Sequence, residues 1–299
     1  MKPPTTSPPR PPTIAPAPAA TRPASSTRIQ MSTEAPPPRG LRVVLNAVEG
    51  WGKTSCAAFA TSPAILMAEG ETGYETLLQH GRAPNVPRDK IANWESLLTY
   101  LHELASGCPF DLLALDALGG IERLCHALVC EREFKNEWGE KGFSGFRRGF
   151  DVAVSEWLKM LQALDAIADG GTHILLLGHV LVRSFKNPLG PDYDRFTGDT
   201  DPKTTAAATG RWADAVLFGT FRTIVDTGAL GGKPKRGKGI GGQDRVLYTQ
   251  HHDAYDAKNR LGMPPEIEIA NDPAALWSTI IGAIGTHPVS NEEKSDATS

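Results

Sequence analysis

The stretch from Leu41 to Ala60 reads Leu-Arg-Val-Val-Leu-Asn-Ala-Val-Glu-Gly-Trp-Gly-Lys-Thr-Ser-Cys-Ala-Ala-Phe-Ala. Its first six residues, Leu41 to Asn46, form an apolar run with the length of a buried β-strand. The glycine-rich residues that follow are typical of a tight turn, and the small residues after Thr54 are compatible with a helix. This stretch therefore predicts a strand, a turn and a helix in direct succession.

The predicted turn carries a Walker A pattern. Glycines such as Gly50 and Gly52 allow consecutive backbone N–H groups to face phosphate oxygens, a lysine reaches the β and γ oxygens, and a hydroxyl ligates magnesium. Lys53 and Thr54 fit the last two roles, and Ala47 stands where the first glycine is usual. A chance turn of this composition is the alternative. We expect ATP and Mg²⁺ to bind here, with the nucleotide held by Ala47, Val48, Glu49, Gly50, Trp51, Gly52, Lys53, Thr54 and Ser55.

A predicted strand that ends in a carboxylate supports this expectation. The run from Phe110 to Leu115 is apolar apart from Asp111, and it finishes in Asp116. A carboxylate at the carboxyl end of a parallel strand lies where the phosphates lie, as in a Walker B pattern. We therefore expect Asp116 to bind the magnesium through water, together with Thr54. A turn or helix-capping role for Asp116 is the alternative.

Hydrolysis also needs a group that orients or deprotonates water. The predicted strand Ala64–Ala68 is followed by Glu69-Gly70-Glu71, and we expect Glu69 to act on the water because it leaves the strand first, with Glu71 as the fallback. His179 follows another strand and is expected to sense the γ-phosphate. The alternatives are a solvated acidic turn and a histidine with only a capping role.

The composition describes a globular protein with polar ends. The chain has 299 residues, 40% hydrophobic and 22% charged, and a net charge of -3, which gives no bulk electrostatic case for nucleic acid or membrane. No apolar run is long enough to span a bilayer, so a cytoplasmic protein is expected. Residues 1–39 hold 12 of the 24 prolines and are expected to be a disordered tail, as are residues 287–299, with one domain over 40–286.

Within that domain, short apolar runs alternate with helical patterns. Strands are expected at Leu41–Asn46, Ala64–Ala68, Asp111–Leu115 and His173–Gly178, and helices at Trp94–Ala105 and Val152–Ala168. This alternation predicts an α/β fold with a mostly parallel central sheet flanked by helices. An antiparallel hairpin built from Ala215–Val225 and Arg245–Gln250 is expected at its C-terminal edge.

The segment Ala257-Lys-Asn-Arg-Leu-Gly-Met-Pro264 resembles the basic segment of RecA-type recombination ATPases, in particular small phage-encoded RecA-like, AAA-type nucleotide-binding proteins linked to single-strand annealing or recombination. The resemblance covers roughly Leu41 to Ile284. It implies a RecA-like P-loop NTPase core, ATP hydrolysis and a ring or filament of identical subunits. It also implies that Lys258 and Arg260 act on the ATP of a neighbouring subunit. A solvent-facing basic turn is the alternative.

The resemblance further implies single-stranded DNA as a partner, together with accessory recombination proteins. Basic and aromatic residues that suit such contacts lie between His179 and Asp214: Arg183, Lys186, Tyr193, Arg195, Phe196 and Lys203. Residues 228–242 add Lys233, Lys235, Arg236 and Lys238 among seven glycines. The aromatic segment Phe134–Phe150 is expected to be an oligomer contact or a lid. Two other functions stay open: a P-loop phosphotransferase acting on a small molecule, and a nucleotide-gated interaction module.

Overall fold

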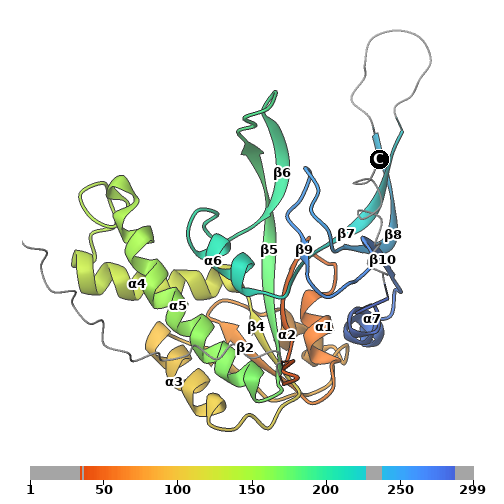
Figure 1. Cartoon of the computed structure of the whole chain (residues 1–299), viewed down its shortest axis with the longest axis horizontal. Helices are drawn as coiled ribbons and strands as arrows, with labels where there is room; N and C mark the ends of the chain where they lie inside the picture. The colour runs from red at the N-terminus through yellow and green to blue at the C-terminus, as the bar shows by residue number, and fades with distance from the viewer. Residues whose placement is uncertain (1–33, 36, 227–237, 287–299) are drawn as a thin grey trace, which may run out of the picture. The chain divides into compact units, whose positions relative to one another are not determined.

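The described part of the chain is built on one ten-stranded sheet (Figure 1). A computed structural model describes residues 34–35, 37–226 and 238–286, and its compact unit begins at Pro38. The strands are β1 (Arg42–Ala47), β2 (Pro63–Ala68), β3 (Arg88–Ile91), β4 (Leu112–Asp116), β5 (His173–Phe185), β6 (Tyr193–Gly198), β7 (Ala215–Asp226), β8 (Lys238–Tyr248), β9 (Lys258–Asn259) and β10 (Glu266–Ile269). The helices are α1 (Lys53–Ala58), α2 (Gly73–Gln79), α3 (Trp94–Ala105), α4 (Leu118–Phe134), α5 (Arg148–Asp169), α6 (Thr205–Trp212) and α7 (Leu276–Gly282).

The strand order along the main sheet is β10-β8-β7-β1-β5-β4-β2-β3, and the pairs from β7 to β3 are parallel. Strands β8 and β10 add antiparallel pairs at the C-terminal edge. The expected α/β fold with antiparallel strands at that edge is therefore confirmed. The first strand of the expected hairpin, β7, is itself parallel to β1 and so belongs to the central sheet.

Strand β5 lies between β1 and β4 in the sheet. In register, Ala47 of β1 is opposite His179 of β5, and Asp116 of β4 is opposite Leu177. Because all three strands run in the same direction, their carboxyl ends meet at one edge. The topology therefore brings the glycine-rich loop, Asp116 and His179 together, although they are far apart in the sequence.

The central strands are buried on both faces, which is why they are short apolar runs rather than alternating ones. Val44 of β1 packs into a core with α3, α4 and α5, whereas Val43 and Leu45 pack into a second core with α1 and α7. Full burial of side chains of this size stabilises the fold by about 1.5–3 kcal/mol each. Two such cores hold the central strands, and with them the loop after β1, in a fixed position.

Beyond His179, β5 leaves the parallel sheet and pairs with β6 as an antiparallel ribbon over Val180–Gly198 (Figure 1). The residues after His179 show no clear periodicity along the sequence, so the sequence alone does not predict this ribbon. The residues of the ribbon are half-buried or exposed apart from the buried Arg195, so they do not show the continuous apolar pattern of a core strand. Leu189, near its turn, is 96% exposed.

The segment between α4 and α5 is fastened by an aromatic cluster. Phe143 contacts the rings of Phe134, Trp138, Phe150 and His126, with ring centroids between 5.0 and 5.8 Å apart. Arg147 adds an ion pair to Asp201, with 2.7 Å between Nη2 and Oδ1. These contacts show how the segment packs on its own chain.

Among the helices of the described residues, none combines the length and apolar character needed to cross a bilayer.

Candidate nucleotide-binding site

The loop after β1 has the backbone conformation that its glycines permit. Gly50 and Gly52 have φ values of 72° and 110°, a left-handed region that is strained for residues with a side chain. Gly52 directly precedes α1, whose first residue is Lys53. The Lys53 ammonium is buried and donates to Ala47 O over 2.8 Å and to Val48 O over 3.4 Å. The lysine nitrogen therefore lies against the loop.

Trp51 anchors the same loop to the C-terminal half of the sheet. Its ring is fully buried, and its Nε1 donates to Thr220 O over 3.1 Å and to Val246 O over 3.3 Å. A Cβ on Gly219 would lie 2.6 Å from the indole, so only glycine leaves room for the ring at that point of β7. Trp51 was expected among the nucleotide-binding residues; in the structure its ring points into the protein.

Arg245 of β8 also holds the loop, a role that cannot be predicted from the sequence alone. Its Nε donates to Trp51 O over 2.6 Å, and its Nη1 donates to Asn271 Oδ1 over 2.7 Å. No local pattern marks Arg245, because its contact depends on the pairing of β8 with β7. The loop is thus supported from β7, β8 and the segment before α7.

The Thr54 hydroxyl and the Asp116 carboxylate meet at the edge of the sheet. Thr54 Oγ1 donates to Asp116 Oδ2 over 2.9 Å, which joins the first turn of α1 to the end of β4. Burial raises the pKa of Asp116, while the hydrogen bond from Thr54 opposes that shift. A hydroxyl and a carboxylate are the hard oxygen ligands that Mg²⁺ prefers. The two residues therefore fit the magnesium site expected from the sequence.

A cleft of about 470 Å³ lies over the loop. Its lining combines the glycine-rich backbone, the lysine, the hydroxyl and carboxylate pair, and residues of the C-terminal region: Glu49, Gly50, Gly52, Lys53, Thr54, Ser55, Glu71, Asp116, His179, Arg245, Pro273 and Leu276 among others. Burial lowers the pKa of Lys53, and the nearby carboxylates of Asp116 and Asp199 oppose that shift. A cavity of this size with backbone donors, cationic side chains such as Lys53 and Arg245, and oxygen ligands fits a nucleoside triphosphate with its magnesium ion.

Of the two glutamates after β2, the structure brings Glu71 and not Glu69 into the cleft. Gly70 has a φ of 92°, and the Glu71 N–H donates to Ala68 O over 3.1 Å. This turn leaves Glu69 exposed at its corner and returns Glu71 to the edge of the sheet. Glu71 Oε1 lies 3.7 Å from His179 Nε2. The structure therefore places Glu71, the fallback, at the cleft and Glu69 in solvent, and which of the two acts on the water stays a prediction.

Asp199 is a further acidic residue near the site that the sequence did not reveal. It follows β6, and its N–H donates to His179 O over 3.0 Å. Its Oδ1 is buried without a hydrogen-bond partner among the described residues, and a Cβ on Gly119 would lie 2.0 Å from its Oδ2. Burial raises the pKa of Asp199, against the effect of His179. Both ends of the β5–β6 ribbon therefore meet beside the nucleotide cleft.

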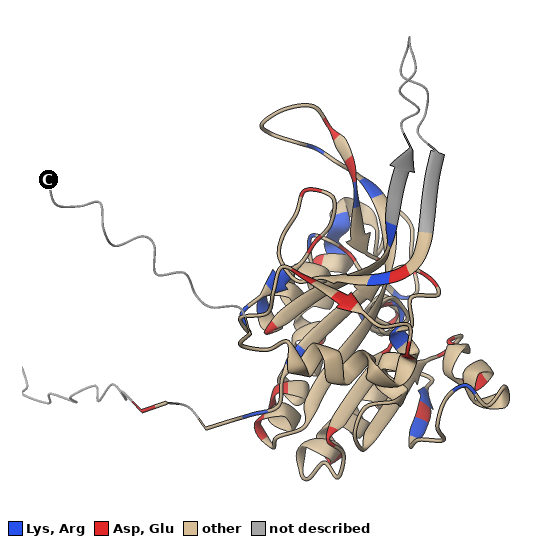
Figure 2. Ribbon diagram, turned by 90° about the vertical axis from the view of Figure 1, so that its right-hand side faces the viewer, with Lys and Arg blue, Asp and Glu red and all other residues tan. Residues whose placement is uncertain are grey.

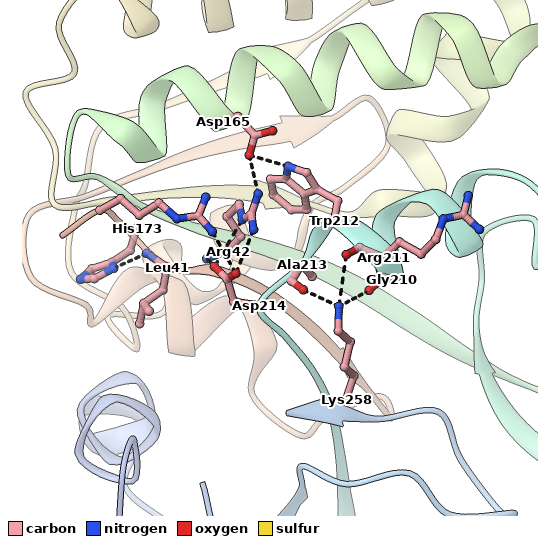
Figure 3. A network of polar contacts seen from close by, with 11 residues as sticks. Leu41, Arg42, Asp165, His173, Gly210, Arg211, Trp212, Ala213, Asp214 and Lys258 are labelled. Atoms are coloured by element: carbon pink, nitrogen blue, oxygen red, sulfur yellow. Dashed lines mark hydrogen bonds and ion pairs between the residues drawn. The ribbon is translucent and has the colours of Figure 1, made fainter. Parts of the chain in front are cut away.

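Lys258 lies at the opposite end of the sheet from the loop. It pairs with Val216 near the start of β7, and its Nζ donates to the carbonyls of Gly210, Arg211 and Ala213 over 2.7, 3.2 and 2.6 Å (Figure 3). All three donors of the ammonium are thus used at the end of α6. Lys258 was expected to extend toward the ATP of a neighbouring subunit, but in this structure its side chain is bonded to carbonyls of its own chain. The side chain of Arg260 is exposed.

The residues expected to contact DNA are distributed over the ribbon and its base. Lys186 pairs with Asp192 over 2.7 Å, and Arg195 is buried and pairs with Asp256 over 2.5 Å. Tyr193 packs on Phe185, and Lys203 is exposed. In the view of Figure 2, basic and acidic residues are interspersed. The loop with Lys233, Lys235 and Arg236 lies outside the described residues, as do residues 1–33, 36 and 287–299 of the expected tails.

Comparison with known families gives one result that bears on this geometry. A family model described as an AAA domain matches residues 39–261, which is most of the chain. The matched range includes the glycine-rich loop, Asp116, Glu71, His179 and the Lys258–Arg260 segment. No curated protein matches the chain.

Proposed function

The chain belongs to the AAA domain family of P-loop NTPases, and on that premise we propose that it binds and hydrolyses ATP while acting on single-stranded DNA in recombination or annealing. Nucleotide binding follows from the family and from the cleft over the glycine-rich loop. The DNA partner is supported by the resemblance of the Lys258–Arg260 segment and by the projecting β5–β6 ribbon.

In the proposed reaction, backbone N–H groups of the loop and the Lys53 ammonium hold the phosphates. Thr54, and Asp116 through water, would hold Mg²⁺, which when bound would neutralise charge that develops on the phosphates. Glu71 is placed to orient the attacking water and accept its proton, and His179 lies beside it, with 3.7 Å between His179 Nε2 and Glu71 Oε1. Arg260, exposed in its own chain, is proposed to reach a neighbouring subunit in a homo-oligomer.

One observation carries the coupling of hydrolysis to DNA. The ribbon begins directly after His179 and ends directly before Asp199, and these two residues are joined by the hydrogen bond from Asp199 N to His179 O. His179 also lies 3.7 Å from Glu71. A ligand that moves the ribbon would therefore also move a residue that lies beside the proposed water-activating carboxylate.

The test is to measure ADP release with and without single-stranded oligonucleotides, beside a sizing measurement with a slowly hydrolysed ATP analogue. Stimulation of turnover by DNA, with assembly into a larger species, supports the proposal. Phosphate transfer to a small molecule without a response to DNA would contradict it. Nucleotide binding without turnover under either condition would contradict it as well and would indicate an interaction module.

A further inference from the structure

Aromatic side chains from separate parts of the chain form one stack at the base of the β5–β6 ribbon. The members of this aromatic stack come from β6, β7, β8 and the loop after β8: Phe196, Phe218, Tyr248, His252 and Tyr255. The ring of Tyr255 is central, with centroid distances of 4.9 Å to Phe218, 4.6 Å to Tyr248 and 5.1 Å to His252. The angles between these ring planes are all below 20°, so the rings are nearly parallel.

The stack leads from the core to solvent. Phe218 is 2% exposed and lies opposite Tyr248 in the β7–β8 ladder, whereas Tyr255 is half-buried and His252 is exposed. Phe196 of the ribbon stacks on Phe218, with 5.2 Å between ring centroids. His252 is therefore the solvent end of a series of rings that begins in the core.

The outer rings are held in place by the backbone. The N–H of Ala254 donates to His252 Nδ1 over 3.0 Å, and the N–H of Tyr255 donates to His252 O over 3.1 Å. The N–H of Phe196 donates to Ala254 O over 2.8 Å, which fastens the loop to the ribbon. A rigid aromatic surface loses little entropy when it binds a ligand.

The charges around the stack favour a flat, uncharged ligand group. Arg195 is buried beside the loop, but its charge is balanced by Asp256 over 2.5 Å. The loop also carries the exposed acidic residue Asp253. The stack is therefore poorly suited to phosphate contacts and well suited to stacking, which every nucleobase can provide.

We propose that His252, backed by Tyr255, is a stacking platform for bases of single-stranded DNA at the base of the ribbon. This inference rests on the proposed function, which supplies the DNA. The stack would add to the binding of the strand an affinity that does not depend on counterion release.

The decisive variants separate the ring of His252 from its hydrogen bond. His252→Asn removes the ring and retains an acceptor for the N–H two residues on, as in an Asx turn. His252→Phe retains a ring and removes the acceptor. His251→Asn is the matched control, because His251 is the exposed neighbour and forms no ring contact within the described chain.

Fluorescence anisotropy with a labelled oligo-dT strand gives the dissociation constant of each variant at several salt concentrations. We expect His252→Asn to raise it by about 5- to 30-fold without changing the salt slope, and His252→Phe and His251→Asn to stay near wild type. On an abasic strand, His252→Asn and wild type should bind alike.

Equal oligo-dT binding by His252→Asn and wild type would overturn the platform, and so would a loss confined to His252→Phe, which would indicate a turn cap only. If the wild-type protein itself fails to bind the strand, the proposed DNA function fails, and the platform that rests on it fails with it. The wild-type measurement therefore distinguishes the two failures.

Discussion

Thr54 Oγ1 donates a hydrogen bond to Asp116 Oδ2 over 2.9 Å, and this contact joins two residues that the sequence separates by 62 positions. It exists because β4 lies two strands from β1, with β5 between them. The pair defines where the metal of an ATP complex would lie, beside the Lys53 ammonium and at the carboxyl ends of the strands.

Replacing Asp116 by Asn should weaken magnesium binding more than nucleotide binding. The amide is a poorer ligand than the carboxylate, so the Mg²⁺ concentration needed for half-maximal turnover should rise about 10- to 100-fold. Titration of turnover with Mg²⁺ checks this, with Asp111→Asn, just before the other end of β4, as the control. An unchanged magnesium requirement would remove Asp116 from the metal site.

Glu71→Gln should abolish most turnover, whereas Glu69→Gln should not. Loss of a water-activating carboxylate typically reduces kcat by about 10²- to 10⁴-fold. The exposed Glu69 is a matched control two residues away with the same side chain. Steady-state ATPase rates with nucleotide affinities measured alongside separate catalysis from binding. The opposite ranking of the two variants would restore Glu69 as the catalytic residue.

Asp214→Asn should destabilise the fold in a pH-dependent way. Burial tends to raise the pKa of Asp214, but hydrogen bonds from Arg42 and its charge outweigh this and hold the pKa below its usual value (Figure 3). The ionised carboxylate therefore adds stability that is present above the unfolded-state pKa of about 3.9 and is lost as the pH falls through the folded-state pKa.

Urea unfolding should show a loss of about 1.5–3 kcal/mol for Asp214→Asn near neutral pH, shrinking below about pH 4. Asp165→Asn, which removes a more exposed partner of Arg42, should have a smaller effect. A gap between Asp214→Asn and wild type that stays constant at acidic pH would show that the charge of Asp214 is not its source.

Lys258 and Arg260 should differ in what their loss affects. Lys258→Met removes the donor shared by three carbonyls at the end of α6, so the free energy of unfolding should fall by about 1–3 kcal/mol. Arg260→Ala should leave stability unchanged and reduce turnover of the assembled protein. Thermal unfolding and ATPase rates of both variants check this. Unchanged stability with lost turnover in Lys258→Met would instead support a trans-acting lysine.

The parts of the fold that could be predicted are those whose signal is local. Short apolar runs predicted β1, β2 and β4. The spacing of apolar residues at three- and four-residue intervals predicted α3, and its predicted bounds, Trp94–Ala105, are those of the structure. The bounds of helix α4 do not follow from the sequence, because apolar and polar residues alternate less regularly in it and it opens with Leu-Gly-Gly, which is a poor helix start.

The sequence predicts those site residues whose positions depend only on their immediate neighbours in the chain. The loop and Asp116 follow from strand ends, whereas the choice between Glu69 and Glu71 depends on the left-handed turn at Gly70. Arg245, Asp199 and the aromatic stack depend on which strands become neighbours, and no periodicity along the chain records that.

The buried indole of Trp51 has a consequence for any shortened version of the protein. Its two carbonyl acceptors, on Thr220 and Val246, belong to the last third of the chain. A fragment that ends before β7 would keep every residue of the glycine-rich motif but lose the strands that hold the motif in its conformation. The presence of the motif in a fragment therefore does not ensure that the fragment binds a nucleoside triphosphate.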